Sequence, residues 1–186
     1  LSFIVSFGFS KAAMNFFAGS IADRIGRKKV LLLGWGVGLF VPLLVIFATH
    51  WWVIVFANVL LGINQGLTWS MTVNMKVDLV KGTQRGLAIG LNEFAGYSGV
   101  ALAAAVSGFI AASYSLRPEP FYLGIGIVIA GLLLSFTVKD TEKHLQLQAR
   151  MQQRKAADPV NPRDIFLKTT WRDSTLSSCS FAGLST

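Results

Sequence analysis

Five apolar segments, each long enough to cross a lipid bilayer, occupy most of the first 138 residues. A helix that spans the hydrocarbon core needs about 17–25 predominantly apolar residues. The segments of this kind are 1–18, which is only marginally apolar, 30–48, 52–72, 86–113 and 121–138. Because backbone polar groups inside a bilayer must be satisfied internally, such runs predict helices. We therefore expect an all-α, polytopic helical membrane protein.

The composition supports the same class. Charged residues make up 14% of the chain and hydrophobic residues 53%, whereas a soluble domain has roughly 25% charged residues. A soluble protein of this length could bury a core, but it would lack the charged surface that water requires. A water-soluble fold is therefore excluded.

Lysine and arginine are distributed unequally between the loops. Of the 17, four follow the first segment, three lie between the third and fourth, and eight lie beyond residue 138. The opposite side has only Arg117, and Lys11 lies within a segment. Since positive loops remain cytoplasmic, we predict cytoplasmic loops at 19–29, 73–85 and 139–173. Membrane insertion thus explains the net charge of +8, and no nucleic-acid partner is required.

Residues suited to metal binding or catalysis are sparse. Cys179 is the single cysteine, which excludes an internal disulfide. Neither His50 nor His144 has a second potential ligand beside it. We expect no metal, no cofactor and no enzymatic activity.

Residues 19–29, GSIADRIGRKK, place a cluster of charge between two apolar segments. We expect a short hairpin here, in which Gly19 and Gly26 permit close packing and a tight turn. Asp23 can accept hydrogen bonds from the N-terminus of a neighbouring helix. Three basic residues either neutralise it or contact anionic lipid headgroups: Arg24, Arg27 and Lys28.

The order of these residues resembles the signature of the major facilitator superfamily, G-x-L-A-D-R-x-G-R-K. The matching positions are Gly19, Ile21, Ala22, Asp23, Arg24, Gly26, Arg27 and Lys28, with isoleucine for leucine as the one change. The resemblance implies that the five segments are helices two to six of this family. Residues 139–173 would then join its two six-helix halves, and 174–186 would begin helix seven. We therefore expect a fragment whose partner is the remainder of its own chain.

The resemblance also implies a function. Members of this family are secondary transporters that move a small solute by alternating access, and we expect one in the plasma (inner) membrane. The signature's aspartate and arginine are thought to latch the two halves together on the cytoplasmic side and to release on inward opening. The alternative is a non-transporting sensor or channel-like protein on the same fold.

Polar side chains inside the apolar segments are the candidate substrate and proton sites, because a charge in hydrocarbon is costly. At a rise of about 1.5 Å per residue, Lys11 lies about 18 Å from the cytoplasmic end of its segment and Glu93 about 12 Å. Asn64 and Gln65 lie about 17 Å deep by the same count. Asn15 is one turn from Lys11 on much the same face. Three segments thus bring polar groups to a similar level.

Each candidate has a structural alternative. Asn64, Gln65 and Asn92 are the kinds of residue that join membrane helices by hydrogen bonds. Glu93 could simply neutralise Lys11 as an ion pair. Lys11 could extend to the membrane surface, but a side chain of about 6 Å is too short for its depth.

Two departures from family patterns bear on the substrate. Many proton-coupled members carry an arginine three residues before a Gln-Gly pair in helix four, where this chain has Gly62. Drug–proton exporters usually have G-x-x-x-G-P in helix five, and this chain has no such proline. Both departures weaken an assignment as a drug antiporter. Glu93 remains as the carrier of a coupling proton, and the cation of Lys11 favours an anionic small-molecule substrate. Trp69 is either an interfacial anchor or a wall of the site.

Overall fold

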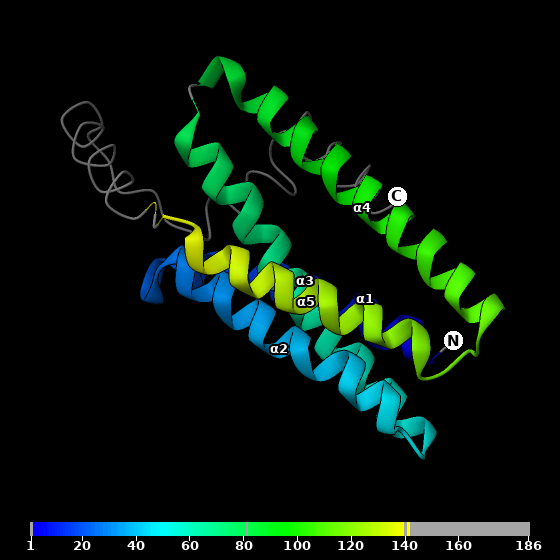
Figure 1. The fold of residues 1–186 in the computed structure, drawn as a ribbon. Coiled ribbons are helices and arrows are strands. Elements are labelled where there is room, and N and C mark those ends of the chain that lie inside the picture. Colours follow the sequence, from blue (N-terminus) through cyan, green and yellow to red (C-terminus); the bar gives the residue numbers. More distant parts are fainter. Residues whose placement is uncertain (1, 81, 140, 142–186) are drawn as a thin grey trace, which may run out of the picture. The chain divides into compact units, whose positions relative to one another are not determined.

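The computed structural model describes residues 2–80, 82–139 and 141. Its elements are α1 (Ser2–Ile25), α2 (Arg27–Phe47), α3 (Trp51–Leu79), the short 3-10 turn η1 (Gly82–Gln84), α4 (Arg85–Ser113) and α5 (Glu119–Thr137). All of these elements are helical (Figure 1), which confirms the predicted all-α class. The predicted start of a further span, 174–186, lies outside the described residues, as does most of the predicted loop 139–173.

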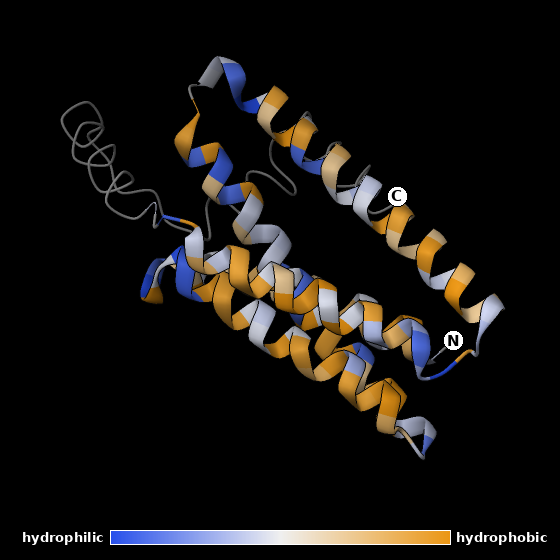
Figure 2. Cartoon of the chain, viewed as in Figure 1, coloured by the Kyte–Doolittle hydropathy of each residue, from blue (hydrophilic) through white to orange (hydrophobic). Residues whose placement is uncertain are grey.

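Four of the described helices are long and apolar enough to cross a membrane: α2, α3, α4 together with η1, and α5. Figure 2 shows orange, hydrophobic residues along these helices and blue, hydrophilic ones at the turns that join α1 to α2 and α3 to α4. α1 has the length of a span but carries Lys11 and Asn15 near its middle. Its assignment as a span therefore remains a prediction.

Two helices run further than the apolar segments from which they were predicted. α1 continues to Ile25 rather than ending at 18, and α3 continues to Leu79 rather than ending at 72. Hydrophobicity marks only the part of a helix that lies in hydrocarbon, whereas backbone hydrogen bonds continue into the polar interface. The turn between α1 and α2 is consequently reduced to Gly26, whose φ of 92° suits glycine.

Helix α3 packs along both α1 and α2, and α2 in turn packs along α5. A Cβ placed on Gly62 would lie 2.6 Å from the carbonyl oxygen of Phe7, and one on Gly66 would lie 2.7 Å from Cβ of Met14. Two glycines four residues apart are a known means of bringing membrane helices into close contact. An arginine at position 62 would meet the same obstacle.

The buried core lies where α1, α2 and α3 meet, and its members are Ala18, Ala22, Val30, Leu31, Leu67, Met71 and Met75. Helix α4 contributes only Asn92 to the buried residues, and it lies apart from the other helices over much of its length (Figure 1). Its large apolar side chains are exposed; Phe94 and Phe109 are examples. In a bilayer such a surface carries no hydrophobic penalty, since lipid tails are equally apolar.

Candidate functional site

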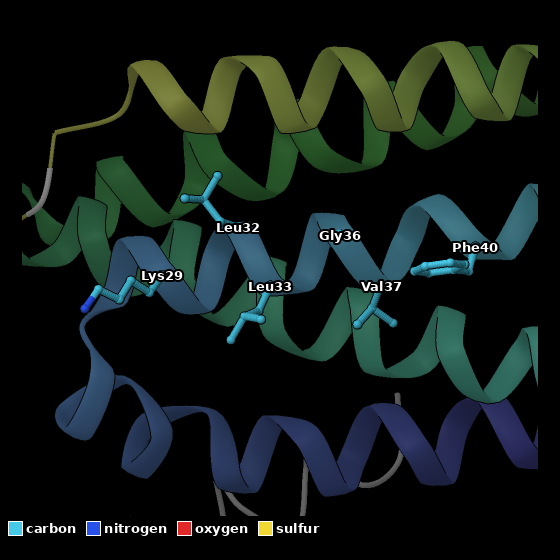
Figure 3. Close-up of a pocket in the computed structure, with 6 residues that line it drawn as sticks. All are labelled: Lys29, Leu32, Leu33, Gly36, Val37 and Phe40. Carbon is cyan, nitrogen blue, oxygen red and sulfur yellow. The ribbon is translucent and has the colours of Figure 1, made fainter.

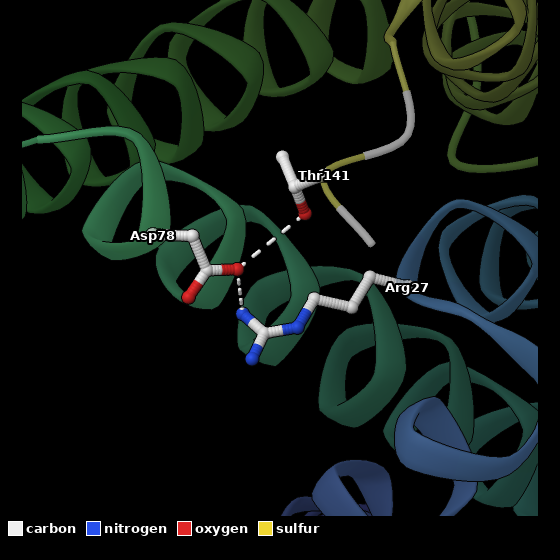
Figure 4. Close-up of polar contacts among 3 residues, drawn as sticks. All are labelled: Arg27, Asp78 and Thr141. Carbon is white, nitrogen blue, oxygen red and sulfur yellow. Dashed lines mark hydrogen bonds and ion pairs between the residues drawn. The ribbon is translucent and has the colours of Figure 1, made fainter. Parts of the chain in front are cut away.

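An ion pair connects the signature segment to the end of α3. Nη1 of Arg27 donates to Oδ2 of Asp78, and Oγ1 of Thr141 donates to the same oxygen at 3.4 Å (Figure 4). Asp78 is buried. The anion sits at the C-terminus of α3 and the cation at the N-terminus of α2, where each helix dipole opposes it. Pairing the two charges offsets both penalties.

Asp23, in contrast, is exposed near the end of α1. No hydrogen bond or ion pair to Asp23 is found among the described residues. Of the roles considered for Arg27, neutralising Asp23 is not the one observed, because Arg27 is turned toward Asp78. Arg24 is also exposed. The latch function of Asp23 and Arg24 therefore stays a prediction.

The two glycines of the signature differ in their surroundings. Gly26 makes the turn, as predicted. A Cβ on Gly19 would meet nothing within 4 Å in the described residues, so the expected close packing is not found there. Gly19 instead lies within α1, because this helix continues past the apolar segment. Lys28 donates to the carbonyl oxygen of Phe136 at 2.8 Å and so connects α2 to the end of α5.

Lys11 of α1 faces α3. Its Nζ donates to Oε1 of Gln65 at 3.2 Å. The same atom lies 5.7 Å from the ring centre of Phe7 and 5.5 Å from that of Trp69, within the range of cation–π attraction. In the described part of the chain, no carboxylate lies within salt-bridge distance of Lys11. The ammonium is thus held by neutral groups.

The other amide candidates divide between two faces of α3. Asn15 faces the same helix as Lys11, and its Oδ1 accepts from Oγ of Ser70 at 3.0 Å. Asn64 instead donates from Nδ2 to the carbonyl oxygen of Gly34 at 2.8 Å, on the α2 side. Asn64 thus joins two helices, as its structural alternative anticipated, while Gln65 and Asn15 lie with Lys11.

Glu93 contacts Trp69, which in turn contacts Lys11. Its Oε1 accepts from Nε1 of Trp69 at 3.0 Å and from Nδ2 of Asn92 at 3.2 Å. The Trp69 ring also packs on α4, where a Cβ on Gly96 would lie 2.5 Å from it. A direct Lys11–Glu93 ion pair is not formed. Trp69 is therefore a wall of this polar cluster, which we define as Lys11, Gln65, Trp69, Asn92 and Glu93.

Sequence reasoning missed two partners that the structure shows. Asp78 lies within the predicted loop 73–85, but in the structure it is at the C-terminus of α3, where a carboxylate is stabilised by a nearby cation. The sequence predicts Lys76 as one of the basic residues that set the orientation, and the structure shows in addition that its Nζ donates to Oδ1 of Asn92 at 2.6 Å. Both residues lie in the part of α3 beyond its apolar segment. Continuing the helical spacing of this segment beyond residue 72 would have placed both residues on the helix.

Two surface depressions lie outside the polar cluster, and the second adjoins it through Lys76, which donates to Asn92. The first follows one face of α2 and is lined by Lys29, Leu32, Leu33, Gly36, Val37 and Phe40 (Figure 3). The second lies where the end of α3 meets the start of α4 and is lined by Lys76, Leu79, Val80, Ala88 and Leu91. Both linings are mainly apolar. Among the described residues, no group of three His, Cys, Asp or Glu side chains could hold a metal.

Comparison with known families explains this arrangement of helices and signature. Residues 1–186 match the family model described as Major Facilitator Superfamily. The chain belongs to this superfamily. Its resemblance at residues 19–29 is thereby confirmed, together with its class as a multi-pass inner-membrane protein of a transporter family.

The following three relatives share one name. Multidrug resistance protein MdtG of Rahnella sp. (strain Y9602) is 28% identical over 141 residues, which cover 75% of this chain and 34% of the relative. MdtG of Salmonella arizonae is 28% identical over 165 residues, covering 88% and 40%. MdtG of Escherichia coli (strain K12 / DH10B) is 27% identical over 165 residues, covering 87% and 39%. The chain thus spans well under half the length of these relatives, and no solved structure matches it.

Proposed function

We propose that the protein containing this chain is a proton-coupled secondary transporter that moves a small solute by alternating access. Superfamily membership supports the transporter class. The observation that carries the proton coupling is Glu93, a carboxylate within α4 that is held by Trp69 and Asn92. In the described residues it has no cation within salt-bridge distance. Such a residue in a span is costly and is usually retained for function.

Lys11 and Glu93 together suggest how proton and solute are coupled. Trp69 contacts both charged residues, since its ring lies near the ammonium of Lys11 and its Nε1 donates to Oε1 of Glu93. Protonation of Glu93 removes the negative charge and leaves Lys11 without an anion nearby. An anionic solute then binds more favourably beside Lys11, and by linkage its binding favours the protonated carboxyl. Proton and anion would move together in this scheme.

A second candidate follows from the names of the relatives. If the solute is a cationic drug-like compound, it would bind best when Glu93 is ionised, and it would compete with the proton. Proton and solute would then move in opposite directions. The aromatic rings of Phe7, Trp69 and Tyr97 around the cluster would suit such a compound. The position of Lys11 favours the anion, and we place that candidate first.

The sign of the proton effect on solute binding distinguishes these candidates. The full-length protein is reconstituted in liposomes, and binding and uptake of anionic and cationic solutes are measured at two pH values. Tighter binding of an anion at the lower pH supports the first candidate, and tighter binding of a cation at the higher pH supports the second. Glu93→Gln should abolish the pH dependence in both. Solute movement that is indifferent to an uncoupler would instead favour the sensor or channel-like alternative.

A further inference from the structure

The hydrogen bonds between α3 and α4 converge on one pair of residues. Nζ of Lys76 donates to Oδ1 of Asn92 at 2.6 Å, and Nε1 of Trp69 donates to Oε1 of Glu93 at 3.0 Å. Within the described residues, these are the two side-chain hydrogen bonds that join α3 to α4. Asn92 is also the one buried residue of α4. The buried amide of Asn92 thus lies beside the carboxylate of Glu93 and makes specific hydrogen bonds there.

The two ends of the Asn92 amide face opposite charges. Its oxygen accepts from the ammonium of Lys76, and its nitrogen donates to Oε1 of Glu93 at 3.2 Å. The reversed amide would point N–H groups at the ammonium and oxygen at the carboxylate, which is unfavourable at both ends. The orientation of Asn92 therefore depends on Lys76, and the second donor to Glu93 depends on the orientation of Asn92.

The outer end of this chain of contacts lies at the surface. Lys76 is exposed and lines the depression at the start of α4 together with Leu79 and Ala88. A hydrogen bond from an exposed lysine is readily exchanged for one to water, because its net contribution is small. Asn92 is buried and lacks that exchange. Movement of α4 away from α3 would break the Lys76 contact and free the amide to turn.

We propose that Lys76 and Asn92 are positioning residues for Glu93, which hold its carboxylate against Trp69 and limit its access from the cytoplasmic side. This inference rests on the proposed function, in which Glu93 carries the proton. In the described part of the chain, hydrogen bonds connect Lys76 to the carboxylate through Asn92. The alternative role is a contact that merely fastens α4 to α3, and the following experiment separates the two.

The test measures the reactivity of Glu93 itself. Full-length protein in liposomes is treated with a hydrophobic carbodiimide, which adds to a carboxyl group, and modification of the Glu93 peptide is followed by mass spectrometry. Glu93→Gln provides the blank. Lys76→Met should raise the modification rate about two- to fivefold, the factor that corresponds to a hydrogen bond of small net contribution. Lys76→Arg still donates and should retain the original rate. Lys139→Met, at another exposed lysine, is the matched control.

Transport kinetics give a second readout. Lys76→Met should lower the turnover number while leaving the KM for solute near its original value, because the solute contacts are unchanged. Asn92→Leu should show the same pattern more strongly; Lys76→Met, at an exposed position, keeps the test valid if the buried substitution fails to fold. Equal modification rates in Lys76→Met and the original protein would overturn the positioning role. Proton-driven transport that survives Glu93→Gln would overturn the proposed function, while the modification rates would still decide the positioning role.

Discussion

Arg27 at the start of α2 and Asp78 at the end of α3 are joined by an ion pair in which the carboxylate is buried. The pair uses one arginine of the family signature within the described helices, while Asp23 of the same signature stays exposed. The signature thus contains a residue that fastens neighbouring helices and another that is open to a further partner. These two roles can be separated by mutation.

The first prediction compares two aspartates. Asp78→Asn should lower the free energy of unfolding by about 1–3 kcal/mol, because Arg27 loses its charged acceptor in a mostly buried setting. Asp23→Asn should leave stability unchanged and lower transport, as expected if Asp23 contacts the other half of the protein. Thermal unfolding in detergent and uptake in liposomes measure the two effects. Equal stability losses in both variants would show that Asp23 also has a structural partner.

The second prediction concerns the close approach of α1 and α3. Gly62→Ala should destabilise the protein by about 1–3 kcal/mol, because its Cβ would lie 2.6 Å from a backbone oxygen that cannot move aside freely. Gly19→Ala, with nothing within 4 Å, is the matched control. It should be neutral or stabilising by about 0.5–1 kcal/mol through helix propensity. A neutral Gly62→Ala would mean that the two helices are not in contact at this position.

The third prediction concerns topology. In a protein whose native Cys179 has been replaced, a cysteine at Gly82 should react with an impermeant reagent only from the cytoplasmic side. A cysteine at Leu116, which is exposed between α4 and α5, should react only from the opposite side. Gly26 is unsuitable for this test because its φ of 92° disfavours other residues. Reaction of both cysteines from the same side would contradict the predicted crossing of α4.

The sequence was sufficient for the helices but not for their ends or partners. Apolar length located each helix because lipid leaves the backbone no other way to satisfy its polar groups. It could not show where α3 ends, since the residues after 72 leave the apolar segment while the backbone stays helical. The sequence analysis therefore did not place Asp78 in a helix and did not predict its ion pair with Arg27. Gly26 was predicted correctly because a positive φ has a direct residue signature.

The candidate site was predicted as a set of residues but not as an arrangement. Depth along each segment places Lys11 and Gln65 at a similar level, because rise per residue is nearly constant, and the structure shows a hydrogen bond between them. Depth says nothing about which face a side chain occupies, and Asn64 proved to lie on the α2 side of α3. The place of Trp69 between Lys11 and Glu93 depends on how α4 approaches α3. The spacing of residues within one segment does not indicate how two helices approach each other.

The last prediction tests whether Lys11 and Glu93 act separately. Were they a simple ion pair, removing either would leave a buried charge without its partner, and removing both would restore stability. The structure instead holds each by neutral groups, with Trp69 between them. We therefore expect the double variant of Lys11→Ala and Glu93→Ala to be less stable than either single variant, with a coupling of about 0.5–1 kcal/mol through their shared contact with Trp69. Recovery of both stability and transport in the double variant would overturn this expectation.

The transport defects of the same positions should also differ in kind. Lys11→Ala should weaken binding most for solutes with negative charge, because it removes the only cation of the polar cluster. Glu93→Gln should retain solute binding but lose dependence on the proton gradient, because an amide does not titrate.

Trp69→Phe keeps a ring beside Lys11 and removes the indole N–H that donates a hydrogen bond to Glu93. It should therefore shift the pH dependence of uptake without abolishing it and leave solute charge preference intact. Binding and uptake across pH for these three variants measure each defect, and a loss of anion preference in Trp69→Phe would show that the ring, rather than Lys11, selects the solute.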